Sequence, residues 1–146
     1  MIGTLRRLWG RVLREHSSPA RLAAASALGI FIGCSPFYGL HFWIGVSLAV
    51  ALRLNKLAVF FGTQTVIPPA VPLVILCDVQ TGSFLRRGTF RALSVGELTA
   101  ADAPRAVGAL LADWLVGWLL VGGTAAAVTF TVVLLLLRLR RSRGLA

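Results

Sequence analysis

Long stretches without any charged residue set the main constraint on this chain. Residues 22–52 contain no Asp, Glu, Lys or Arg, and the same holds for residues 57–77 and 114–137. A soluble domain usually has about 25% charged residues, whereas this 146-residue chain has 14%, together with 57% hydrophobic residues. So few charges cannot cover a compact soluble surface, and disordered chains are poor in apolar residues. The sequence therefore predicts an all-α integral membrane protein.

The first 17 residues predict a basic amphipathic helix in the membrane interface. Hydrophobic side chains recur at helical spacing within residues 1–16. Arginines lie between them, at Arg6, Arg7, Arg11 and Arg14. We expect the apolar stripe to enter the acyl boundary and these arginines to contact anionic lipid headgroups. Packing of this helix on the rest of the protein is the alternative.

The first uncharged block, residues 22–52, predicts a short re-entrant hairpin. One membrane span needs about 20 residues, so the block is too long for one span and short for two. A turn sequence lies in its middle, Ser35-Pro36-Phe37-Tyr38-Gly39, where Pro36 removes a helical hydrogen-bond donor. We predict helical arms at about 20–34 and 40–53, with a tip that stops inside the bilayer.

The second uncharged block, residues 57–77, is interrupted by Pro68-Pro69, which cannot lie in the middle of a regular helix. One kinked span and a second short hairpin with its break near residues 66–70 both fit this pattern, and our fold prediction takes two broken hairpins. We expect Asp78, directly after the block, to lie at a membrane boundary.

The third uncharged block, residues 114–137, predicts one long C-terminal transmembrane helix. Trp114 and Trp118 near its start are typical of interfacial aromatic residues, and we expect Asp113 at the same interface. The chain then divides into an interfacial helix, a single polytopic membrane domain and a basic cytoplasmic tail. The bounds of these three parts are 1–17, 18–137 and 138–146.

The net charge of +10 does not indicate nucleic-acid binding, because the basic residues flank the apolar blocks and no RNA-binding signature accompanies them. Lys and Arg in these positions mark the cytoplasmic ends of membrane segments. We therefore expect a membrane protein with both termini in the cytoplasm.

The reactive residue types give little sign of catalysis or metal binding. Cys34 and Cys77 lie in apolar runs and form no C-x-x-C pair, so we expect buried free thiols. The two His residues and five carboxylates are scattered, whereas acid–base catalysis needs two groups within reach in one pocket. The sequence predicts no catalytic residue, no metal, no cofactor and no enzyme activity.

The segment ALGIFIGCSPFYGLH, residues 27–41, resembles a bacterial membrane family catalogued as domain of unknown function twenty sixty-two. The similarity continues through residues 52–56 and more loosely to 115–120, and it covers most of residues 18–137. The family tends to have Asn-Pro where this chain has Ile67-Pro68. The resemblance implies a small bacterial inner-membrane protein and brings no activity with it.

Gly29 and Gly33 form a G-x-x-x-G pattern that allows two helix backbones to approach closely. A homodimer face and packing within the hairpin both fit this pattern. Because 146 residues enclose little volume, we expect a homo-oligomer if the protein contains a pathway.

The two broken blocks carry the functional prediction. Non-helical backbone at membrane depth survives only when it is buried in protein or lines a wet cavity. Paired short, interrupted segments are typical of a transporter site. The candidate pathway residues are Ser35, Pro36, Gly39, His41, Thr63, Gln64 and Pro68. His41 either contacts a ligand or a proton, or bonds a backbone carbonyl. The sequence predicts a small transporter-like protein, and a membrane scaffold or partner subunit without its own substrate is the alternative.

Overall fold

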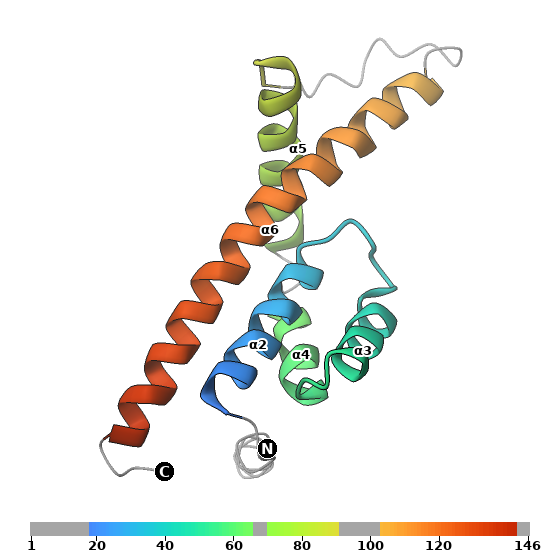
Figure 1. Cartoon of the computed structure of the whole chain (residues 1–146). Coiled ribbons are helices and arrows are strands. Elements are labelled where there is room, and N and C mark those ends of the chain that lie inside the picture. Colours follow the sequence, from blue (N-terminus) through green and yellow to red (C-terminus); the bar gives the residue numbers. More distant parts are fainter. Residues whose placement is uncertain (1–17, 66–69, 91–102, 143–146) are drawn as a thin grey trace.

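The computed structural model describes residues 18–65, 70–90 and 103–142 (Figure 1). Over these residues the chain forms helices and no strand, which confirms the all-α prediction for this part of the sequence. The helices are α2 (Pro19–Gly33), α3 (His41–Ala51), α4 (Lys56–Thr63), α5 (Val71–Arg87) and α6 (Ala103–Ser142).

Several predictions fall outside the described residues. The interfacial helix of residues 1–17 is among them, with its headgroup contacts at Arg6, Arg7, Arg11 and Arg14. Pro68 and the last residues of the basic tail, 143–146, also lie outside the described part of the chain.

Helix α6 is long and apolar enough to cross a membrane, by length and composition, and it is the one such helix within the described ranges. Its 40 residues correspond to about 60 Å. The predicted span began at Trp114, whereas the helix begins at Ala103. It includes Asp113, whose carboxylate pairs with two arginines of α5. The other helices have 8 to 17 residues, fewer than the roughly 20 that a single span needs.

The break between α2 and α3 lies where the sequence predicts it. The Ser18 side chain caps α2 by accepting the Arg21 N–H at 3.4 Å, and Pro19 occupies the first turn. Residues 34–40 are not helical, and Gly39 has a φ of +85°, which favours glycine. The expected pairing of the two arms is wrong in detail, because α2 packs chiefly on α6 and α4 and only lightly on α3.

A tight turn joins α3 to α4 at residues 52–55. Arg53 has a φ of +53°, and its carbonyl accepts a hydrogen bond of 2.6 Å from the Arg21 guanidinium at the start of α2. Asn55 caps α4, because its Oδ1 accepts the Ala58 N–H at 3.0 Å. The turn is therefore tied to the same end of the molecule as the start of α2.

Two helix crossings are made by glycines that lie on the partner backbone. A Cβ on Gly29 of α2 would lie 2.7 Å from the Cα of Gly62 of α4, and a Cβ on Gly62 would lie 2.8 Å from the Ser26 carbonyl oxygen. In the same way, a Cβ on Gly82 of α5 would overlap the Asp113 carbonyl of α6, and a Cβ on Gly117 would overlap the Asp78 carbonyl of α5.

These crossings place the G-x-x-x-G pattern within the chain. Gly29 contacts α4, and Gly33 at the end of α2 is buried. The sequence predicted that this glycine face packs on the other arm of the hairpin or on a second copy of the chain. In the structure, Gly29 packs on α4 instead. Figure 1 shows the corresponding crossing of α5 over α6.

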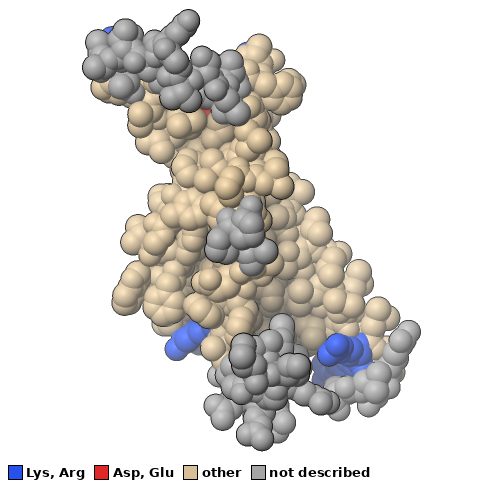
Figure 2. Space-filling model, turned by 180° about the vertical axis from the view of Figure 1, so that it is seen from behind, with Lys and Arg blue, Asp and Glu red and all other residues tan. Residues whose placement is uncertain are grey.

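The basic residues gather at one end of the molecule. The start of α2 and the end of α6 lie there in Figure 1, together with the turn between α3 and α4. Figure 2 shows Lys and Arg at this end and a mostly uncharged surface above it on the face drawn, with small blue and red patches near the opposite end. The described basic residues at this end are Arg21, Arg53, Lys56, Arg138, Arg140 and Arg141. Those at the opposite end are Arg86, Arg87 and Arg105.

Candidate functional site

The break between α2 and α3 contains a buried hydroxyl group without a hydrogen-bond partner. Ser35 is 1% exposed, and its Oγ has no partner in the structure. The Nε2 of His41 lies 3.2 Å from the Ser35 carbonyl oxygen, where the ring donates if Nε2 carries the proton. His41 therefore braces the break by bonding a backbone carbonyl, which was one of the two roles considered for it. Pro36 is half-buried beside Ser35, and Gly39 is exposed.

Helix α5 places a buried carboxyl group near this break. Asp78 is 0% exposed, and neither of its carboxyl oxygens has a hydrogen-bond partner. Its charge interacts with Cys34 and Tyr38 of the break. The indole N–H of Trp114 on α6 is also buried without a partner. It lies near enough to Asp78 to act on the carboxyl group as a hydrogen-bond donor, but it does not meet full hydrogen-bond geometry.

Aromatic rings from α6 hold the break in place. The rings of Tyr38 and Trp114 lie 6.0 Å apart between centroids, and those of Phe37 and Trp118 lie 5.9 Å apart. The Trp118 Nε1 donates a hydrogen bond of 2.9 Å to the Phe31 carbonyl of α2. The two tryptophans are thus half-buried and pack against the break.

Asp78 and Trp114, beside the break that contains Ser35, form what we call the Asp78 cluster. A buried polar group costs free energy unless it is hydrogen-bonded, and a buried charge costs much more. The Asp78 carboxyl group is therefore either neutral or accompanied by a cation or donor, and the described residues supply none with hydrogen-bond geometry. The cluster combines a carboxyl group and an indole N–H, so it suits a proton or a small polar ligand.

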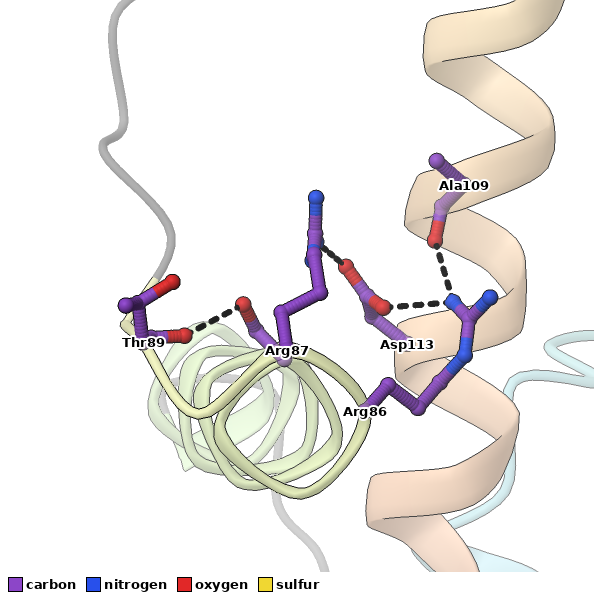
Figure 3. Close-up of polar contacts among 6 residues, drawn as sticks. Arg86, Arg87, Thr89, Ala109 and Asp113 are labelled. Carbon is purple, nitrogen blue, oxygen red and sulfur yellow. Dashed lines mark hydrogen bonds and ion pairs between the residues drawn. The ribbon is translucent and has the colours of Figure 1, made fainter.

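The second buried carboxylate, Asp113, is fully compensated. It is 0% exposed, and Arg86 reaches its Oδ1 at 2.6 Å while Arg87 pairs with its Oδ2 (Figure 3). Arg86 also donates to the Ala109 carbonyl at 3.4 Å. The two arginines come from the last turn of α5, and Asp113 comes from α6, so the ion pairs fasten the two helices together.

Asp78 and Asp113 occupy equivalent places in the α5–α6 crossing. Each lies four residues before the glycine of its own helix, Gly82 and Gly117, and each carbonyl lies against the other helix's glycine. The sequence assigned both carboxylates to membrane boundaries, whereas the structure buries both inside the protein. The shared D-x-x-x-G spacing is the signal that was available for this pairing.

The described residues of the second predicted break, Thr63 and Gln64, do not supply partners to the Asp78 cluster. Thr63 is buried, its hydroxyl donates to the Phe60 carbonyl at 2.7 Å, and its methyl group lies toward Gly45 of α3. Gln64 is exposed at the end of α4. In the described part of the chain, no group of three or more His, Cys, Asp and Glu residues is placed to hold a metal ion.

Comparison with known proteins agrees with the resemblance that the sequence motifs indicate. A family model described as "Uncharacterized protein conserved in bacteria (DUF2062)" matches residues 3–145. No curated protein and no solved structure matches the chain.

Proposed function

Because this chain belongs to the DUF2062 family of uncharacterised bacterial proteins, we propose its function from the geometry of its own residues. It is a small inner-membrane protein of the transporter type, and its site is the Asp78 cluster at the break between α2 and α3. The unpartnered, fully buried carboxyl group of Asp78 is the observation that carries this proposal. Ionisable groups at membrane depth are costly and typically mark substrate or proton pathways.

The proposed membrane arrangement follows from helix length and charge. Helix α6 crosses the bilayer, the α2–α3 pair enters and returns to the basic end, and α4 and α5 cross in succession as a broken helix. This arrangement puts both termini and the end with Arg21, Lys56 and Arg140 in the cytoplasm, as the positive-inside rule requires. At the opposite end, Arg86 and Arg87 are paired with Asp113, so they oppose this orientation only weakly.

Water should reach the Asp78 cluster in a transporter. Cys34 is buried beside Ser35, and Cys77 is the exposed second thiol, so the variant Cys77→Ser carries one reporter at the break. We expect a membrane-impermeant thiol reagent to label Cys34 in intact membranes from at least one side. Full labelling after denaturation is the control for reactivity. Cys34 that reacts only after denaturation would mean a dry, packed break and would overturn the proposal.

Replacement of Asp78 tests whether its burial has a structural purpose. Asp78→Asn removes the charge and keeps the shape. We expect the free energy of unfolding in detergent to rise by about 1 kcal/mol, because folding no longer has to bury or neutralise a carboxylate. The readout is unfolding followed by tryptophan fluorescence. A fall of similar size would show that Asp78 stabilises the fold through a partner, which contradicts a site kept for function.

The alternative function is a membrane scaffold or partner subunit. It is favoured by the outer face of α3, where Phe42 and Trp43 are exposed. This face suits lipid, a second copy of the chain or another membrane protein equally well. A dry Cys34 together with loss of a co-purifying subunit in Trp43→Ala would select this alternative.

A further inference from the structure

A cavity lies at the basic end of the molecule, between the start of α2 and the last turns of α6. Its volume is about 490 Å³, and its walls include Ser18 and Pro19 on one side and Leu134, Arg138 and Arg141 on the other. The three α6 residues are spaced four and then three positions apart, so they share one face of the helix. The cavity is therefore apolar toward Leu134 and cationic toward the helix end.

The cavity is surrounded by positive charge, and no acidic residue of the described ranges pairs with its arginines. Arg138 and Arg141 are exposed, and the ion pairs of the described residues join only Arg86 and Arg87 to Asp113. Asp78 and Asp113 are the acidic residues in the described ranges, and both are buried near the α5–α6 crossing. The start of α2 adds the positive end of its helix dipole to the cavity.

We propose that this cavity binds a phosphate group, carried by an anionic lipid headgroup or free in the cytoplasm. Guanidinium groups present a planar fork of donors that matches phosphate oxygens. Basic pockets between helices at the cytoplasmic side of a membrane are typical headgroup sites. The uncharged stretch of α6 ends at Leu137, directly before Arg138. A lipid phosphate at the arginines would therefore leave its acyl chains on the Leu134 side. The lipid source rests on the membrane insertion proposed above.

The test uses the full chain extracted from membranes into a zwitterionic detergent. Its thermal unfolding is followed while phosphatidylglycerol or inorganic phosphate is added. Arg138→Ala and Arg141→Ala remove the cavity's guanidinium groups. Arg140→Ala is the matched control, because it removes the same charge from the same helix end but does not line the cavity. Unfolding without added ligand checks that each variant is folded.

We expect phosphatidylglycerol to raise the unfolding temperature of the wild type and of Arg140→Ala. The half-saturating lipid concentration should increase about tenfold in Arg138→Ala and in Arg141→Ala, as for loss of one charge-assisted contact. Equal stabilisation by inorganic phosphate, with the same dependence on the two arginines, would identify free phosphate as the ligand. If Arg140→Ala weakens binding as much as the other two variants, binding is diffuse and the proposed site is wrong.

These outcomes are separate from those that test the transporter proposal. A dry Cys34 would overturn the Asp78 site and leave the lipid titration unaffected. A chain that stays out of the membrane fraction on cell lysis would remove the proposed function and the lipid source together. An unchanged lipid affinity in Arg138→Ala and Arg141→Ala, for a chain found in membranes, would overturn only the phosphate site.

Discussion

Gly82→Ala should separate α5 from α6 and lower the free energy of unfolding by about 3 kcal/mol or more. An added Cβ would overlap the Asp113 carbonyl and would lie 2.9 Å from the backbone nitrogen of Gly117. Both neighbours are backbone atoms, so no side-chain rotation can relieve the overlap. The helices can only move apart, and their movement disturbs the burial of Asp78 and Asp113 together.

Unfolding in detergent, followed by tryptophan fluorescence to which Trp114 and Trp118 near the crossing contribute, measures this effect. Gly123→Ala is the matched control, because Gly123 also lies on α6 and a Cβ there meets nothing within 4 Å. We expect this control to be neutral or to stabilise the helix by up to about 1 kcal/mol, since alanine favours helix more than glycine. Similar destabilisation of the two variants would contradict the close crossing.

Asp113→Asn should lower the free energy of unfolding by about 2–3 kcal/mol. The change leaves Arg86 and Arg87 without the carboxylate that now pairs with both. Loss of one partner from a fully buried ion pair lowers the free energy of unfolding by more than this, about 3–5 kcal/mol. Here the arginine side chains remain 41% and 43% exposed, so water compensates part of the loss.

Two comparisons isolate the ion pairs. The variant with Arg86→Gln, Arg87→Gln and Asp113→Asn together should recover most of the stability, because no unpaired charge remains. Arg105→Gln removes a basic residue from the same end and should change stability by less than about 0.5 kcal/mol. If Asp113→Asn alone matches Arg105→Gln, the ion pairs do not hold α5 and α6 together. If the ion pairs do hold the helices together, Asp113→Asn lowers the free energy of unfolding whereas Asp78→Asn raises it, although both replace a fully buried carboxyl group.

The helices could be predicted from local sequence, and their pairing could not. The uncharged blocks, Pro19, Gly39 and the proline-rich segment near residue 68 locate the helices and breaks. These features act within a few residues, so they can be read along the chain. The choice of α4 and α6 as partners of α2 depends on glycines brought together from distant positions, such as Gly29 and Gly62.

The residues of the candidate site were even harder to predict from local sequence than the helix pairing. Ser35 and His41 were identified because they border a visible break. Asp78 was not, because a carboxylate next to an uncharged block has the same sequence context at a membrane boundary and in a protein interior. Its burial depends on Gly117 of α6, which lets the two backbones meet. The packing of Trp114 and Trp118 on the break could not be predicted for the same reason, since their indole groups meet it only in the folded chain.

The glycine contact between α5 and α6 also has a mechanical consequence. The closest contact of this crossing is made by backbone atoms at Gly82, so a rotation of α5 against α6 would turn about this point. Asp78 and Arg86 lie four residues on either side of it, at arms of about 6 Å along the helix. Rotation of α5 about this point moves the two arms in opposite directions. Release of Arg86 from Asp113 at one end would therefore move Asp78 at the other end relative to the break that contains Ser35.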